Sequence, residues 1–215
     1  MLYQNLSKTF YYFMYKHFPA PHYVVLDTCV LISNTVRKLL IRMAQHHCIA
    51  PVWGDYIGEE WRRNIPKIWD VSEEFAEREW DFMQKQFPQA NMGLVHEFEK
   101  DLRYSDAKDH HVIACALSMQ QKAPNERISI ITWNLKDFAR KEIRDLGLYL
   151  YTPDQLLAML WPVHKELMMD LFGCFALDAL EVGRPELTIP EFLKRERLFA
   201  VKKYYEAELQ QALVS

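Results

Sequence analysis

The sequence has few residues that break or cross-link a chain. Glycine occurs only six times in 215 residues, and no segment is dominated by one residue type, which argues against a low-complexity protein. The four cysteines lie far apart among apolar neighbours, without a CxxC pair or a cluster of Cys and His. This spacing argues against a zinc site or a disulfide framework and predicts buried free thiols in a reducing compartment.

The sequence also has no large excess of positive or negative charge. The formal net charge is −3, and no run contains five like charges. Any binding of nucleic acid must therefore use a local patch, because no overall positive field attracts it. The aromatic-rich N-terminus is too polar to span a membrane and has no small-residue cleavage site. We expect a cytoplasmic protein with no membrane partner.

Half of the residues are hydrophobic, which is ample for a buried core. Short β-branched or apolar runs alternate with segments of helical periodicity, and this alternation predicts an α/β fold, a three-layer α/β/α sandwich with a parallel sheet. The predicted strands are 23–27, 48–53, 127–133 and 148–151. The predicted helices between them are 30–47, 54–63 (ended by Pro66), 70–87, 94–103, 105–120 and 134–144.

The chain divides into three parts. Residues 1–21 form an aromatic-rich extension that ends in a stiff Pro-Ala-Pro break, and we expect it to pack on the main body or on another subunit. Residues 22–153 contain the predicted sheet. Residues 154–215 show no strand pattern and form a helical C-terminal extension, whose last helix is predicted from about Pro190 to Leu213.

Asp27 stands inside the most apolar stretch, Val24-Val25-Leu26-Asp27-Thr28-Cys29-Val30. A carboxylate in a buried segment is costly unless it is paired or holds a metal ion. Asp27 is therefore either the end of a core strand with a structural partner or part of a functional site.

Further carboxylates follow the other predicted strands. Glu59 and Glu60 lie in the helix after the second strand, Asp106 and Asp109 open the helix before the third, and Asp137 follows the third. These positions share one edge of a parallel sheet, where ligands usually bind. Several carboxylates together raise each other's pKa values unless a cation lies between them, and oxygen ligands suit Mg²⁺ or Mn²⁺. Such a centre can activate water for attack at phosphorus.

Four segments resemble the signature segments of PIN domains, and more narrowly the VapC-like toxin ribonucleases of bacterial type II toxin–antitoxin pairs. They are VVLDTCVLIS, GEEWRRNI, SDAKDHHVIACAL and IITWNLKDF, in that order. The later segment GRPELTIPEFL is similar to the C-terminal extension of one branch of these proteins. The resemblance covers about residues 22–195.

The resemblance implies a role for each matching residue. Asp27, Glu60 and Asp109 would hold the metal, with Asp106 as a further ligand on the helix face of Asp109, and Asp137 would hold or orient a second metal or the water. Thr28 and Asn134 are expected to contact substrate. Asn134 stands where other PIN domains often carry a carboxylate, so it is expected to bind water or phosphate. Arg62 and Arg63 are candidate phosphate contacts, although a solvated helix face explains them equally well.

The resemblance also implies an activity and partners. It implies an Mg²⁺- or Mn²⁺-dependent endoribonuclease that leaves a 5′-phosphate and a 3′-hydroxyl, a homodimer, and a small antitoxin encoded beside it. The alternative is a PIN-like module that binds RNA or protein with little or no catalysis. A phosphotransferase with Asp27 as nucleophile fits less well, because such proteins carry a second Asp two residues on, where this chain has Cys29.

Overall fold

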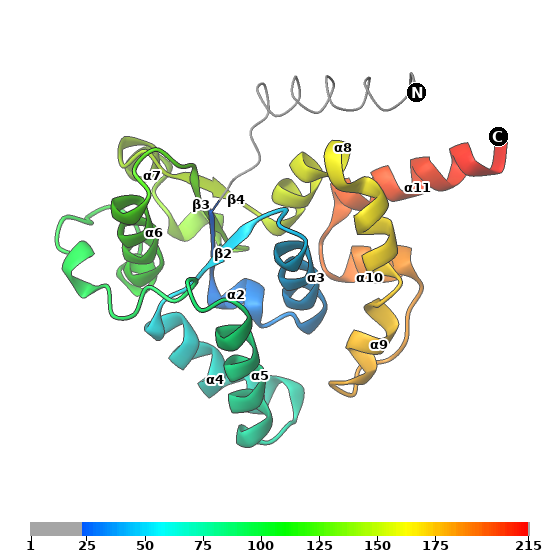
Figure 1. Ribbon diagram of the computed structural model, residues 1–215, viewed down its shortest axis with the longest axis horizontal. Coiled ribbons are helices and arrows are strands. Elements are labelled where there is room, and N and C mark those ends of the chain that lie inside the picture. The colour runs from blue at the N-terminus through cyan, green and yellow to red at the C-terminus, as the bar shows by residue number, and fades with distance from the viewer. Residues whose placement is uncertain (1–22, 215) are drawn as a thin grey trace.

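The computed structural model describes residues 23–214, which form a mixed α/β protein around a four-stranded parallel sheet (Figure 1). The predicted extension of residues 1–21 lies outside the described residues. The sheet order is β2-β1-β3-β4, and the strands are β1 Tyr23–Leu26, β2 Ala50–Val52, β3 Ile128–Ile131 and β4 Tyr149–Tyr151. Each strand falls within a range predicted from the sequence, which confirms the α/β class and the parallel sheet.

Strand β1 lies in the interior of the sheet. It pairs with β2 on one side and with β3 on the other, and Val24, Val25 and Leu26 are completely buried, as their unbroken apolar run predicts. Leu26 is in register with Ile131, so the next residues of the two strands emerge side by side. The chain leaves β1 towards β2 and later returns to the opposite side of β1 as β3. The strand order therefore reverses between β1 and β3, where α/β sheets usually bind ligands.

Helices lie on both sides of the sheet. Helix α3 Asn34–Gln45 and helix α6 His110–Lys122 flank it from opposite sides in Figure 1, as right-handed crossovers require for connections that run in opposite directions. This arrangement is compatible with an α/β sandwich. The other elements before residue 153 are α2 Thr28–Leu31, α4 Asp55–Trp69, α5 Glu73–Gln86, α7 Arg140–Asp145 and the 3-10 turns η1 His96–Phe98, η2 Ala107–Asp109 and η3 Leu135–Asp137.

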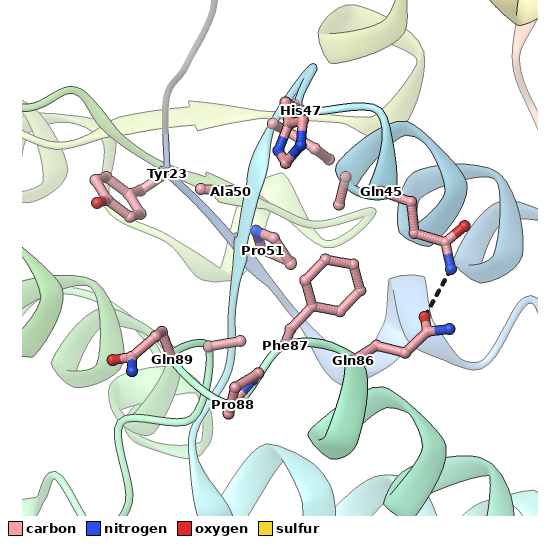
Figure 2. A pocket seen from close by; sticks show the side chains of 12 residues that line it. Tyr23, Gln45, His47, Ala50, Pro51, Gln86, Phe87, Pro88 and Gln89 are labelled. Carbon is pink, nitrogen blue, oxygen red and sulfur yellow. Dashed lines mark hydrogen bonds between the residues drawn. The ribbon is translucent and has the colours of Figure 1, made fainter.

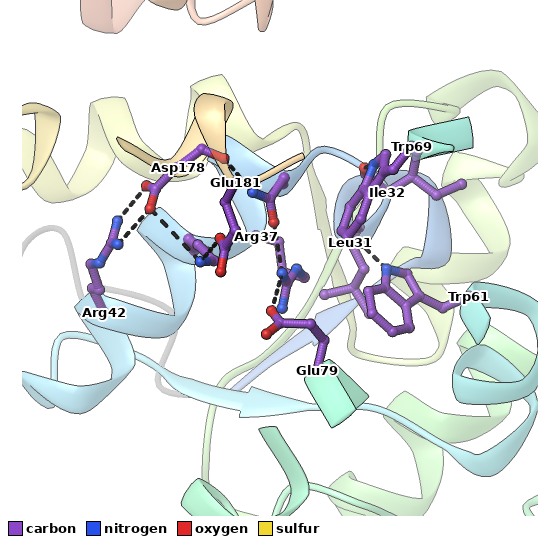
Figure 3. A network of polar contacts seen from close by, with 11 residues as sticks. Leu31, Ile32, Arg37, Arg42, Trp61, Trp69, Glu79, Asp178 and Glu181 are labelled. Carbon is purple, nitrogen blue, oxygen red and sulfur yellow. Dashed lines mark hydrogen bonds and ion pairs between the residues drawn. The ribbon is translucent and has the colours of Figure 1, made fainter. Parts of the chain in front are cut away.

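The C-terminal part is helical, as predicted, with α8 Pro153–Phe172, α9 Phe175–Leu180, α10 Ile189–Arg195 and α11 Phe199–Val214. It is tied to α3 by polar contacts (Figure 3). Asp178 of α9 is 2% exposed and accepts two hydrogen bonds from Arg42, of 2.5 and 2.6 Å. The backbone carbonyl of Asp178 accepts a 2.6 Å bond from the Asn34 side chain. No helix among residues 23–214 is both long and apolar enough to cross a membrane.

The helix predicted over 54–63 does not end at Pro66, as was expected. It is α4, and it continues to Trp69. A proline inside a helix costs about 3 kcal/mol. Trp69 offsets this cost, because its ring is 6% exposed and its indole N–H donates a 2.9 Å bond to the carbonyl of Ile32. Burial of an aromatic side chain contributes about 3 kcal/mol, and the buried hydrogen bond adds about 1 kcal/mol.

Two further helix predictions are wrong in extent. Of residues 94–103, only η1 is helical, and as a 3-10 turn. The last helix, predicted as one, is two, because Arg197 adopts a left-handed conformation with φ 59°. The break is stabilised from a distant element: the Asp154 carboxylate accepts hydrogen bonds from the backbone N–H groups of Ala200 and Val201 and so caps the start of α11.

Candidate functional site

Asp27 follows the last residue of β1 and is only 4% exposed. Its Oδ2 accepts a 2.6 Å hydrogen bond from the hydroxyl of Thr132, which follows β3, and a 3.1 Å bond from the thiol of Cys29. Its backbone N–H donates to the carbonyl of Ile131. Asp27 therefore has structural partners at the carboxyl ends of the strands, and its part in a functional site stays a prediction.

Cys29 supports Asp27 as a protonated thiol. Burial, and then the negative charge of Asp27, raise the pKa of the Cys29 thiol far above its ordinary value. The thiol donates to Asp27, and its sulfur accepts a 3.3 Å bond from the backbone N–H of Trp133. Cys29 therefore links the residues that follow β1 and β3 through hydrogen bonds. The sequence predicted a core cysteine and missed this role, although its position two residues after Asp27 was a signal.

Glu60 lies on α4, and its side chain is 33% exposed. Its Oε2 accepts a 2.7 Å hydrogen bond from the hydroxyl of Thr28. Nε2 of His111 lies 3.9 Å from the same oxygen, too far for a hydrogen bond, and is a buried nitrogen with no hydrogen-bond partner among the described residues. Burial lowers the pKa of His111, although Glu60 and Asp27 act in the opposite direction. His111 is therefore a neutral imidazole beside the Glu60 carboxylate.

Asp109 has a raised pKa to which the other four predicted acids contribute. Burial raises its pKa to about 6, and negative charges add to the shift in the order Asp27, Asp137, Asp106 and Glu60. The other four carboxylates therefore lie near enough to Asp109 to disfavour its charged form. The expectation that all five meet at one sheet edge stays a prediction.

Backbone bonds fasten the two acidic turns to each other. The N–H of Asp106 donates a 2.8 Å bond to the carbonyl of Asp137, and the Asp106 carboxylate accepts from the N–H of Lys108. Asp137 ends η3 and is half-buried. The turn before Asp106 is held by buried Glu142, whose carboxylate accepts three bonds of 2.8–3.2 Å from the N–H groups of residues 103–105. Sequence reasoning missed Glu142, whose partners lie nearly forty positions away.

The predicted substrate contacts differ in exposure. Thr28 is 3% exposed and bonded to Glu60, so it orients that carboxylate and presents no surface to a substrate. Arg62 turns towards α5, where it contacts Glu77 at 3.3 Å and lies over the ring of Trp80. Arg63 is exposed one turn beyond Glu60 on the same helix face. Asn134 is exposed, and its backbone N–H donates to the Thr132 hydroxyl.

The fit of a metal ion to these residues is partial. The carboxylate oxygens are the hard donors that Mg²⁺ and Mn²⁺ prefer, and both bonds to Asp27 go to Oδ2. However, residues 23–214 contain no group of three or more His, Cys, Asp or Glu side chains placed to hold an ion. The other four acids thus act on the charge of Asp109 without forming such a group.

A cavity of about 550 Å³ lies elsewhere, against the start of β1 and β2 (Figure 2). Tyr23, Pro51 and Phe87 line it, and the side-chain amides of Gln45 and Gln86 bond to each other at its side. None of the five acids lines this cavity, so it belongs to the opposite end of the strands from Asp27.

Comparisons with known proteins assign no family. No family model matches the sequence, and neither a curated protein nor a solved structure matches it.

Proposed function

We propose that this protein is a metal-dependent endoribonuclease with a PIN-like fold. One observation carries the proposal: at the carboxyl end of the sheet, burial and then the negative charges of Asp27, Asp137, Asp106 and Glu60 raise the pKa of Asp109 to about 6. Surplus negative charge at this point of an α/β sheet favours a site for a divalent cation. The four segments that resemble PIN domains add support from the sequence.

Each residue has a part in this proposal. Asp27, Glu60 and Asp109 would hold the metal, Asp106 would assist, and Asp137 would hold or orient a second metal or the water. A divalent cation here would supply a Lewis acid that activates water and offsets charge at phosphorus. Thr132 and Cys29 orient Asp27, and Thr28 orients Glu60. These two carboxylates are therefore already ordered before the reaction begins. Cleavage is expected to leave a 5′-phosphate and a 3′-hydroxyl.

The resemblance leads to further proposals about context. We infer that the chain is the toxin of a toxin–antitoxin pair, acts as a homodimer in the cytoplasm, and is held inactive by a small antitoxin. Expression of the wild-type chain would then arrest growth, and expression of Asp27→Asn would not.

A matched pair of variants on α4 tests the nuclease. Glu60 and its neighbour Glu59 differ in that Glu60 is bonded to Thr28, whereas Glu59 is exposed. With Mn²⁺ and RNA, Glu60→Gln and Asp27→Asn are expected to lose about a hundredfold or more of the cleavage rate, and Glu59→Gln is expected to keep it. Intact RNA after incubation with wild-type protein, together with no Mn²⁺ binding by calorimetry, would refute the proposal.

The second candidate is a PIN-like module that binds RNA or protein without cleaving. The absence of a converged set of three metal ligands among residues 23–214 favours it. The same experiment separates the two, because a binding module would retain RNA without metal-dependent products.

A further inference from the structure

Tyr56 is an exposed aromatic side chain next to the acidic site. It is 45% exposed and lies on α4 one turn before Glu60, so the two side chains share a helix face. The Tyr56 ring contacts the ring of His111, with centroids 4.6 Å apart and planes tilted by 52°. His111 is buried and lies 3.9 Å from Glu60. Tyr56, His111 and Glu60 therefore form one continuous contact group.

This contact fixes the position of Tyr56 while much of its ring stays in water. A tyrosine has only two side-chain torsions, and a helix presents it more rigidly than a loop does. A rigid ring that remains half exposed can stack on a flat partner with little loss of entropy.

The same face of α4 continues with cations. Tyr56, Glu60, Arg63 and Lys67 follow one another at intervals of four, three and four residues, which places them in one stripe along the helix. Arg63 and Lys67 are exposed. At 1.5 Å per residue the stripe is roughly 16 Å long, enough for several nucleotides of an extended strand. The stripe thus has an exposed aromatic ring at one end, an acid of the candidate site next to it, and two exposed cations beyond.

We propose that this stripe, Tyr56–Glu60–Arg63–Lys67, binds a single-stranded segment of RNA, with one unpaired base stacked on Tyr56 and phosphates on Arg63 and Lys67. The proposal rests on the proposed function and names the substrate class for that site. A base within a duplex is already stacked on both faces, so only an unpaired base can use the tyrosine ring. His111 is a positioning residue that holds the Tyr56 ring beside Glu60.

The test measures binding separately from cleavage. Full-length protein with Asp27→Asn is titrated, with a chelator present, into a fluorescently labelled oligoadenylate and into a blunt RNA duplex of equal length. Tyr56→Ala is expected to weaken binding of the single strand by about tenfold, and Tyr56→Phe to preserve it, since stacking needs the ring and not the hydroxyl. Arg63→Ala and Lys67→Ala are each expected to reduce the salt dependence of binding.

Tyr149 supplies the matched control. It is 43% exposed and lies at the start of β4, away from the carboxyl ends of the strands. Tyr149→Ala is expected to leave binding of the single strand unchanged. Thermal melting followed by circular dichroism establishes that each variant is folded. If Tyr56→Ala is unstable, the test is repeated with Tyr56→Leu, which removes the aromatic ring but keeps an apolar side chain.

The two proposals fail in different ways. The proposal for the stripe is refuted if Tyr56→Ala binds the single strand as tightly as the Asp27→Asn parent does. It is also refuted if the parent binds strand and duplex equally well. Both outcomes hold even if the wild-type protein cleaves RNA. Tyr56-dependent binding by a wild-type protein that leaves RNA intact and binds no Mn²⁺ supports the proposal for the stripe and overturns the nuclease.

Discussion

The hydroxyl of Thr132 donates a hydrogen bond of 2.6 Å to Oδ2 of Asp27, and the two residues are 105 positions apart in the chain. Each stands one residue beyond the end of its strand. Because Leu26 is in register with Ile131, parallel pairing brings the two next residues together without a further element. The bond holds the first acid of the candidate site at the point where the strand order reverses.

Thr132→Val removes this bond and leaves a buried carboxylate with one donor fewer. A hydrogen bond to a charged group contributes about 2 kcal/mol, so urea denaturation is expected to show a loss of this size. Ser129→Ala is the control on the same strand, since Ser129 is completely buried and its hydroxyl has no hydrogen-bond partner among the described residues. It is expected to be neutral. Equal losses in both variants would show that the bond to Asp27 adds nothing.

Asp109→Asn is expected to stabilise the metal-free protein at neutral pH. The pKa of Asp109 is raised from 3.8 to about 6 in the folded protein, so between these values the folded state holds a proton that the unfolded state has lost. Stability due to this group therefore falls as the pH rises through that window, and the penalty is complete above about pH 6.

The gain in Asp109→Asn is about 1 kcal/mol near neutral pH, reduced from the full value of the shift because water screens a partly exposed group. It should vanish below about pH 4, where Asp109 is protonated in both states. Urea denaturation at both pH values measures it. A gain that persists in acid would contradict the electrostatic origin.

Metal binding is expected to reverse the loss of stability that the charged Asp109 causes at neutral pH. A cation bound between the acids favours the folded state by mass action, so Mg²⁺ or Mn²⁺ should raise the melting temperature of the wild-type protein and a chelator should restore the original value. Asp27→Asn and Asp109→Asn each remove a proposed ligand and should shift much less with added metal, whereas Glu59→Gln should respond as the wild type does. An identical metal response in all four proteins would place the ion elsewhere.

The C-terminal helices are held by an ion pair between Asp178, which is buried, and Arg42, whose side chain is 25% exposed (Figure 3). Asp178 is 2% exposed and bonded twice by Arg42, so Asp178→Ala removes two charge-assisted hydrogen bonds and is expected to cost about 2 kcal/mol. Nearby Glu181 pairs with Lys38 at the surface, and Glu181→Ala is expected to cost less than about 1 kcal/mol. Urea midpoints compare the two variants. A smaller loss in Asp178→Ala than in Glu181→Ala would refute the role of burial.

Local patterns predicted much of the fold. The four strands were predictable because each is a short apolar run, and the start of α5 was predictable because Ser72 caps it, accepting a bond from the N–H of Phe75. Helix ends were less predictable. Pro66 is a strong local signal that the burial of Trp69 outweighs, and the start of α11 depends on Asp154, over forty positions away.

The sequence likewise identified some residues of the candidate site and missed the contacts that support them. Asp27, Asp106, Asp109 and Asp137 were singled out by their places after strands and at helix starts, and Glu60 was chosen over Glu59 by the resemblance to PIN domains. The support of these acids was missed. Thr28 was expected to contact substrate and bonds to Glu60 instead, and Arg62 is engaged by Glu77.

The sequence alone determined the α/β class, the parallel sheet and the order in which the acids occur, because hydrophobic periodicity and turn residues act within a few positions. Only the tertiary structure decided which groups meet: Thr132 and Cys29 on Asp27, Thr28 on Glu60, and Tyr56 on His111. Such contacts depend on strand register and helix packing, which arise from the whole core.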